Sequence, residues 1–461
     1  REQRIHHHHT FARLMLDDPP VKRARLAERP RVGTCVFADR VARCAVDAYE
    51  RLPTSSSDAR PLRTVLAAFV VHDDVEDALT CVALGVGTKT SGRRFDNPRG
   101  ARVIDAHAEV LARRALKRWT WRAAETREGA SPFFERAMEK GVEKLVMRSN
   151  VSLHLYISSA PCGNACVRRW AKGRARRRRD DLGRAGTPRE AHEPLSRSAC
   201  DAGQVALCVK VVKRSKDDEA CARVRGMLER GELAPGTAPV GGDGGEALTC
   251  SDKLCVWNVV GYQGALLRRH VRDPMYVRSI TIGRKYSEPH AHRALCCRAD
   301  GFRSRRGAFA TTHPATMETA VTFDDTPIDA DEGAVFDMPF AMTWSLGDER
   351  EDVLNGRTGM TLDDEETPSS TCQAAFFAAH ARLAGGAAED VEFTPRAYAD
   401  AKREADEEYD DAKNDLFAHP KMFEPRRDFP GWHEKKSLRA SGYERRRALA
   451  IRLGAADRAS V

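Results

Sequence analysis

The chain has 461 residues, which allows one large domain or up to about three ordinary ones of roughly 150 residues each. Its 76 Lys and Arg against 67 Asp and Glu give a net charge of +9, which permits an anionic partner such as RNA without requiring one. Charged residues make up 31% of the chain and argue for a soluble protein. The longest clean apolar run, Val65–Val71, is far shorter than the ~18 residues of a membrane span, so no membrane partner is expected.

The cysteine content points to a reducing compartment. The chain has 13 cysteines, an odd number, and no recognisable secretory signal. This pattern predicts reduced thiols in the cytoplasm or nucleus, with some available to a metal, and not a disulfide framework.

The ends of the chain differ in composition from its middle. Residues 1–35 are rich in Arg and Pro, and we expect them to form a disordered tail. Residues 441–461 are expected to form a basic tail. Within the chain, Lys172–Arg179 has six cationic residues in eight, which fits either a solvated loop or a contact for RNA or for nuclear import.

The elements alternate between helices and strands. Arg40–Leu52 is predicted to be a helix, because apolar residues recur on one face of it at Val41, Ala45, Ala48 and Leu52. Leu62–His72 could be either a helix or a strand. Strands are predicted at Thr80–Gly87, Val151–Ile157, Val205–Val212 and Tyr276–Ile282. A long amphipathic helix is predicted at Ala397–Phe417, and the alternation as a whole favours an α/β sandwich.

Two short motifs carry metal-binding chemistry. His107 and Glu109 form an H-x-E pair at the start of an apparent helix, and Cys162 follows Pro161 directly after the strand at Val151–Ile157. Zinc favours imidazole and thiolate ligands in a tetrahedral set, and a Glu beside such a site can handle the protons of a bound water.

The third protein ligand is ambiguous from spacing alone. A second Cys three residues after Cys162 would fall at Ala165, so the simple C-x-x-C pattern fails. Cys166 would still share a helix face with Cys162, and Cys250 is the other candidate.

Several longer segments together resemble the adenosine deaminases acting on RNA, and among them most closely the enzymes specific for tRNA. The matching segments are Gly87–Lys89, Asp105–Arg114, Leu153–Gly163, Cys250–Leu267, Tyr286–Leu295, Tyr398–Lys413 and Gly431–Lys435. The resemblance implies one deaminase domain over residues 36–440. It also implies a cytidine-deaminase-like three-layer sandwich with a mixed central sheet, to which C-terminal helices are added.

The resemblance also implies a set of site residues. His107, Cys162 and Cys250 would hold zinc, and Glu109 would carry protons in the hydrolytic deamination of adenosine to inosine. Thr88 and Lys89 would line the nucleotide pocket. The resemblance leaves Cys166, Cys255 and the pair Cys296–Cys297 without a role.

A second cofactor implied by the resemblance is inositol hexakisphosphate, enclosed by the C-terminal helices. A buried polyanion needs many cations and donors around it. Matching positions are Asp105, Arg113, Arg114, Lys253, Trp257, Tyr398, Lys402, Tyr409, Lys413, Trp432 and Lys435, with Asp105 and Lys253 linking this site to the zinc. Val256 and Met360 stand where the family has an Arg and a Lys.

The expected partner is tRNA, and the implied target is position 37, next to the anticodon of tRNA-Ala. Too few residues precede Val41 for a double-stranded-RNA-binding module, and a loop base is easier to extrude than a base in a duplex. The alternatives are editing of double-stranded RNA or mRNA, and a catalytically silent RNA-binding protein. No DNA partner is expected.

Overall fold

The computed structural model describes residues 35–53, 64–90, 97–126, 131–162, 165, 209–211, 246–323, 340–356, 358–362, 367–386 and 392–418. The described strands are β1 Leu66–Asp73, β2 Ala78–Val86, β3 Thr88–Thr90, β4 Asp105–His107, β5 Phe134–Glu139, β6 Val142–Met147, β7 Val151–Ser159, β8 Val209–Val211, β9 Glu246–Leu248, β10 Ser279–Arg284, β11 Ala315–Glu318, β12 Phe340–Ser345 and β13 Asp352–Asn355. The described helices are α1 Cys35–Glu50, α2 Ala108–Glu125, α7 Cys250–Val260, α8 Ala265–Arg268, α9 Glu288–Leu295, the 3-10 helix η3 Cys297–Ala299, α10 Gln373–Leu383, α11 Pro395–Ala405 and α12 Glu407–Ala418. Residues 1–34, Lys172–Arg179 and residues 441–461 lie outside the described residues.

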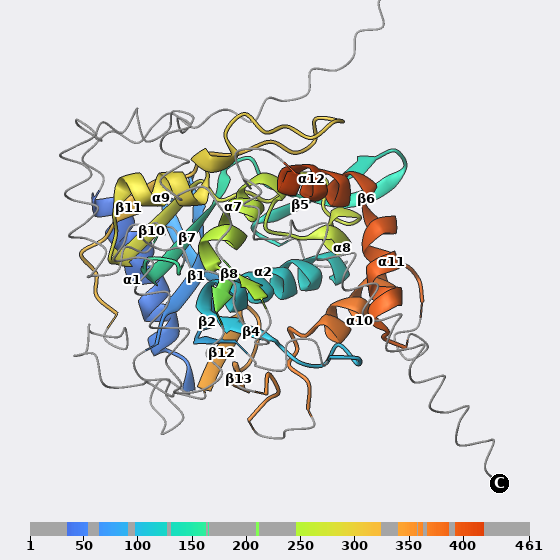
Figure 1. The fold of residues 1–461 in the computed structure, drawn as a ribbon, viewed down its shortest axis with the longest axis horizontal. Helices are drawn as coiled ribbons and strands as arrows, with labels where there is room; N and C mark the ends of the chain where they lie inside the picture. The colour runs from blue at the N-terminus through green and yellow to red at the C-terminus, as the bar shows by residue number, and fades with distance from the viewer. Residues whose placement is uncertain are drawn as a thin grey trace, which may run out of the picture.

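A mixed seven-stranded sheet forms the centre of the molecule (Figure 1). Its strand order is β11-β10-β7-β1-β2-β12-β13. The β11–β10 and β10–β7 pairs are parallel, and the other pairs are antiparallel. The sequence-based prediction of a mixed α/β architecture is therefore confirmed.

The central strand β1 is buried on both faces. Its residues alternate between two cores: Ala67, Phe69 and Val71 face one, and Leu66, Ala68 and Val70 face the other. A strand buried on both faces reads as a continuous apolar run. For this reason the segment Leu62–His72 could not be assigned from its sequence.

Helices cover both faces of the sheet and make three layers. α1 packs on one face, and the predicted residues Val41, Ala45, Ala48 and Leu52 are all buried. α2 and α7 cover the other face. The backbones of β2 and α2 approach so closely that a Cβ atom on Gly85 would lie 2.3 Å from the Ala112 nitrogen.

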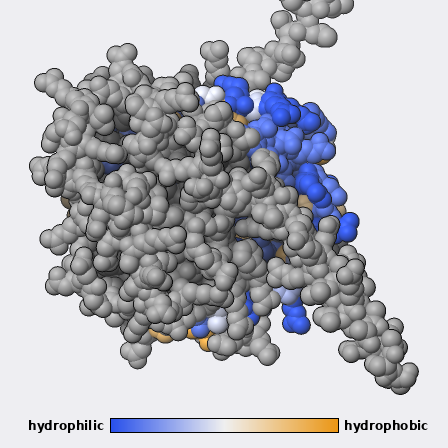
Figure 2. Space-filling view, viewed as in Figure 1, coloured by the Kyte–Doolittle hydropathy of each residue, from blue (hydrophilic) through white to orange (hydrophobic). Residues whose placement is uncertain are grey.

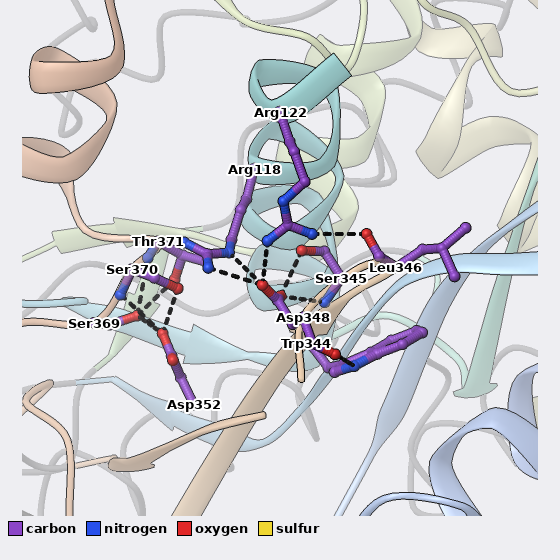
Figure 3. A network of polar contacts seen from close by, with 10 residues as sticks. All are labelled: Arg118, Arg122, Trp344, Ser345, Leu346, Asp348, Asp352, Ser369, Ser370 and Thr371. Carbon is purple, nitrogen blue, oxygen red and sulfur yellow. Dashed lines mark hydrogen bonds and ion pairs between the residues drawn. The ribbon is translucent and has the colours of Figure 1, made fainter. Parts of the chain in front are cut away.

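The edge of the sheet is tied to α2 by the Asp348 carboxylate (Figure 3). Arg118 donates to this carboxylate at 2.9 Å, Arg122 also pairs with it, and the Ser345 hydroxyl donates at 2.6 Å. Figure 3 also shows Asp352, on β13, accepting from Ser369 and Ser370. The contacts of Asp348 fix α2 against the turn between β12 and β13, and so fix the helix that begins beside His107.

The predicted single helix Ala397–Phe417 is wrong, because the chain forms two helices, α11 and α12. Asp406 between them is extended, with φ −164° and ψ 100°. Its carboxylate pairs with Arg268 at 3.0 Å and accepts the Tyr409 N–H at 3.0 Å, so it caps α12. Figure 2 shows a hydrophilic surface at the edge where Figure 1 places α11.

Two further expectations depend on the extent of the described chain. Of the predicted strand Val205–Val212, the described part is β8, Val209–Val211, which pairs with β9. None of the described helices is long and apolar enough to cross a membrane.

Candidate metal centre

His107 lies at the junction of β4 and α2. β4 pairs with β3 so that Thr88 is opposite His107, and α2 begins at the next residue, Ala108. The His107 Nδ1 atom lies 2.6 Å from an oxygen of Asp105. A carboxylate at one ring nitrogen orients the imidazole and leaves the other nitrogen, Nε2, for a metal ion.

Two cysteines from distant parts of the chain meet near His107. Cys162 follows β7, and Cys250 is the first residue of α7. The Cys250 N–H donates to the Cys162 sulfur at 3.4 Å, and the Ser251 N–H donates to the Cys162 carbonyl at 3.0 Å. The start of α7 is thus joined to the turn that carries Cys162.

Ligand atoms of His107, Cys162 and Cys250 all lie within 4.8 Å of one another. One imidazole and two thiols are a donor set that zinc favours, and three protein ligands leave one tetrahedral position open. The neighbouring Cys162 thiol raises the pKa of Cys250 well above its usual value, and a cation between the two sulfurs would remove this cost. The residues therefore fit a zinc ion. Cys166, the alternative candidate, lies outside the described residues.

Glu109 adds a buried acid to the same place. It lies in the first turn of α2 and is 4% exposed. Burial raises its pKa above the usual range, and the nearby Cys162 charge raises it further. The carboxyl group thus lies among the three candidate ligands and away from bulk water.

A buried ion pair supports the orientation of His107. Lys253, in the first turn of α7, pairs with Asp105. Although burial of Asp105 opposes its ionisation, the charges of Lys253 and His107 hold the pKa of its carboxyl well below the usual range. Asp105 therefore accepts hydrogen bonds from both Lys253 and His107, and so links α7 to the candidate metal centre.

A second ion pair lies beneath the first turn of α7, and the sequence motifs did not identify it. The Asp252 carboxylate accepts from the N–H and the hydroxyl of Thr249. The Asp252 N–H donates in return to the Thr249 hydroxyl oxygen, which completes a capping box at the start of the helix. The other oxygen of Asp252 pairs at 2.6 Å with Arg298, and both side chains are fully buried. Nothing local in the sequence near Arg298 indicates this partner, which is 46 residues away.

Cations gather on the face of α2 that points toward the C-terminal helices. Arg113, Arg114 and Lys117 on α2 are partly buried, as is Lys402 on α11. Burial lowers the pKa of Lys117 well below its usual value, and the charges of Arg113, Arg114 and Lys402 lower it further. Like charges held together in this way fit a bound polyanion. Lys117 was missed in the sequence, although it lies one helical turn after Arg113.

Aromatic and backbone groups surround these cations. The Arg113 guanidinium lies 4.5 Å from the centre of the Trp257 ring and donates to the Tyr262 carbonyl at 2.8 Å. Arg114 donates to the Thr371 carbonyl at 2.5 Å, and Lys402 lies 5.2 Å from the centre of the Tyr398 ring.

The remaining expected residues of the polyanion site have mixed outcomes. Tyr409 is buried beside Arg113, and Lys413 is partly buried on α12. Val256 and Met360, at positions where the resemblance implies cations, are buried apolar residues. Trp432 and Lys435 lie outside the described residues, as does the side chain of the expected pocket residue Lys89.

Comparisons with known proteins identify the family of this chain. Residues 83–436 match the family described as the adenosine-deaminase (editase) domain. The rat double-stranded RNA-specific adenosine deaminase is 29% identical over 436 residues, which cover 90% of this chain and 32% of that protein. The double-stranded RNA-specific editase Adar of Drosophila melanogaster is 24% identical, and the match covers 71% of this chain and 44% of that protein. The tRNA-specific adenosine deaminase 1 of the same organism is 28% identical, and the match covers 52% of this chain and 53% of that protein.

The matches cover different shares of this chain and of the related proteins. The chain spans about a third of the length of the rat enzyme and about half of the tRNA-specific enzyme. The family match itself covers well over half of the chain and includes His107, Cys162, Cys250 and Glu109. The chain therefore belongs to the adenosine-deaminase (editase) domain family, the adenosine deaminases that act on RNA.

Proposed function

We propose that this protein catalyses the hydrolytic deamination of adenosine to inosine in RNA, at the candidate metal centre. The observation that carries the proposal is the buried Glu109 carboxyl beside three converging zinc donors, in a chain of the editase family. Water replaces the amino group at C6 of the adenine, and ammonia leaves.

The chain's own residues divide this work. When bound by His107, Cys162 and Cys250, a zinc ion would lower the pKa of a water molecule toward neutrality. Asp105 holds the imidazole in one tautomer through its 2.6 Å contact. Glu109 accepts the proton of the attacking water and delivers it to the departing ammonia, which is the role of the Glu in zinc deaminases. We assign contact with the nucleotide to Thr88, which lies opposite His107 on β3, and to the neighbouring Lys89.

The RNA substrate has two candidates. The resemblance of the quoted motifs favours tRNA, with position 37 of tRNA-Ala as the target. The comparisons favour duplex RNA, because the double-stranded RNA-specific relative matches 90% of this chain and the tRNA-specific one 52%. We take duplex RNA as the more strongly supported substrate and tRNA-Ala as the alternative.

Glu109→Gln tests the reaction. The variant keeps the size of the side chain and the three ligands but cannot carry the proton. We expect inosine formation to fall at least about 100-fold with zinc content unchanged. Asp74→Asn, an exposed carboxyl variant next to β1, serves as the matched control and should keep its activity. Full inosine formation by Glu109→Gln would refute the proposed mechanism.

The substrate is decided by sequencing-based inosine mapping on two RNAs, a long perfect duplex and a tRNA-Ala transcript. Inosine in the duplex and none at position 37 supports the first candidate, and the reverse supports the second. Inosine in neither RNA, from protein with full zinc content, would refute the deaminase proposal for both.

We also propose that the cations of α2 and α11 enclose inositol hexakisphosphate. The support is the mutual repulsion of Arg113, Arg114, Lys117 and Lys402, which an enclosed polyanion would relieve. Denaturation of the protein should release one inositol phosphate per chain, which mass spectrometry would detect. Lys117→Met should lose it, and Lys144→Met, on β6 and paired with Glu139, should keep it. Fully active protein without any inositol phosphate would refute this assignment.

A further inference from the structure

A pocket lies beside the carboxyl end of α2, apart from the candidate metal centre. Its volume is about 460 Å³, within the roughly 300–1,000 Å³ of pockets that hold small molecules. Arg122, which lines the pocket, lies about 21 Å along the helix axis from Ala108, the residue that follows His107. We propose that this pocket binds an apolar organic acid, that is, a carboxylate attached to a hydrocarbon or aromatic body.

The buried part of the pocket lining is apolar. Trp119 from α2, Phe134 from β5 and Leu145 from β6 line the pocket, and each of these residues is no more than 5% exposed. The rings of Trp119 and Phe134 lie 4.8 Å apart and pack against each other. Such a lining stabilises the hydrocarbon part of a ligand by removing it from water. Because the two rings are this buried, neither offers an open face on which a nucleobase could stack, so the lining favours an aliphatic or aromatic acid over RNA.

Arg148 gives the pocket a positive charge with an unused donor. It directly follows β6, and its backbone N–H donates to the Phe133 carbonyl at 3.1 Å, which fixes the start of its side chain. Its Nε atom is buried and has no hydrogen-bond partner among the described residues. A buried donor without an acceptor is destabilising, and a carboxylate matches the geometry of a guanidinium. A ligand carboxylate beside Arg148 would therefore satisfy this donor.

The other two arginines of the pocket already have acidic partners. Arg122 pairs with Asp348, as Figure 3 shows. Arg136 pairs with Glu143 at 2.7 Å and donates to the Thr126 carbonyl at 2.7 Å. This second contact satisfies a carbonyl at the end of α2, which would otherwise repel an anion. One guanidinium is therefore left for the ligand.

The charge balance of the lining selects a single negative charge on the ligand. One open guanidinium compensates one carboxylate, whereas a phosphate dianion would keep a second charge without a partner beside apolar side chains. An apolar amine is disfavoured because its charge would face Arg148. The lining also includes Glu135, but this residue is exposed, so water and salt screen its repulsion of an acid.

The proposal is tested by calorimetric titration of the full chain with phenylbutyrate. Phenylbutyramide, which has the same shape and no charge, is the matched control ligand. We expect a Kd of roughly 1–10 mM for the acid, as for other ligands of this size. The amide should bind at least about tenfold more weakly, because it cannot form the charge-assisted contact. Arg148→Met should weaken the acid by the same factor, and Arg305→Met, which removes an exposed arginine outside the pocket, should not.

A second variant tests the location of the site without changing its charge. Ala123 lines the pocket and is partly buried, so Ala123→Phe should fill the pocket while the Tm stays within about 3 °C of the wild-type value. This variant should bind neither ligand. Equal binding of the acid and the amide by the wild-type protein would overturn the proposal, and so would full binding of the acid by Ala123→Phe.

Two further titrations separate this ligand from macromolecules. A blocked peptide with Glu beside Phe carries the same chemistry, and binding of that peptide without binding of phenylbutyrate would assign the pocket to a partner protein and overturn the proposal. Displacement of phenylbutyrate by a single-stranded RNA would overturn it as well. Because inosine formation enters none of these measurements, a failure here is distinguishable from a failure of the deaminase proposal.

Discussion

The buried ion pair between Arg298 and Asp252 should dominate the stability of the region around α7. We consider the substitution Arg298→Met, which keeps most of the side-chain volume and removes the charge. Arg298 is the largest fully buried side chain among the described residues, and its partner is equally inaccessible. The substitution would leave the Asp252 carboxylate buried, with only the contacts from Thr249.

The magnitude follows from the burial of both groups. Breaking a buried pair by removing one partner costs about 3–5 kcal/mol, because the other charge stays desolvated. Total stabilities are about 5–15 kcal/mol, so the loss would be a large share of the free energy of unfolding. Asp252→Asn combined with Arg298→Met should be less destabilised than Arg298→Met alone, since no charge then remains buried.

Urea unfolding followed by circular dichroism measures these differences. The exposed pair of Arg305 with Asp415 provides the matched control, because Arg305→Met removes an Arg whose side chain is 83% exposed. That control should lose no more than about 1 kcal/mol. If Arg298→Met were as stable as Arg305→Met, the reasoning from burial would be refuted.

Three further predictions concern other parts of the fold. Burial lowers the pKa of His154 to about 3 from 6.5, so the unfolded chain takes up a proton that the folded chain does not. Stability should therefore fall as the pH drops below about 6.5, by about 2 kcal/mol at pH 5, and urea titrations of His154→Asn should show a flatter profile. Gly85→Ala should destabilise the protein by at least about 2 kcal/mol in the same assay, because the added Cβ meets the backbone of α2. Gly386→Ala, where the nearest atom is 3.4 Å away, should be close to neutral. Asp105→Asn should weaken zinc binding at the His107 centre about 10–100-fold in a chelator competition, and unchanged affinity would contradict the orienting role of Asp105.

Two elements could be predicted from the spacing of apolar residues within a single segment. The apolar spacing at Val41, Ala45 and Ala48 located α1, and the alternation in Val151–Ile157 located β7. The alternation indicated that the second face of β7 would be polar, but part of that face is buried. Tyr156 lies in the second core, because α1 covers that face of the sheet.

Features that depend on distant partners were beyond the sequence. The break between α11 and α12 is fixed by Asp406, whose partner Arg268 is 138 residues away. The choice between Cys166 and Cys250 as neighbour of Cys162 could not be made from spacing, because it depends on the approach of α7 across 88 residues. Lys117 was within reach of pattern reasoning, since a cation one turn after Arg113 shares its helix face.

The first turn of α7 shows why the candidate site can be built from separate segments. The Cys250 N–H and Ser251 both bond to the Cys162 turn, while Asp252 pairs with Arg298 and Lys253 with Asp105. Consecutive residues of a helix point about 100° apart, so one turn reaches partners on three sides. The same turn therefore supplies one candidate ligand, orients a second through Asp105, and anchors the segment that carries Arg298. A substitution anywhere in this turn therefore disturbs several of these contacts at once. To assign a role to any one residue, zinc content, stability and inosine formation have to be measured separately.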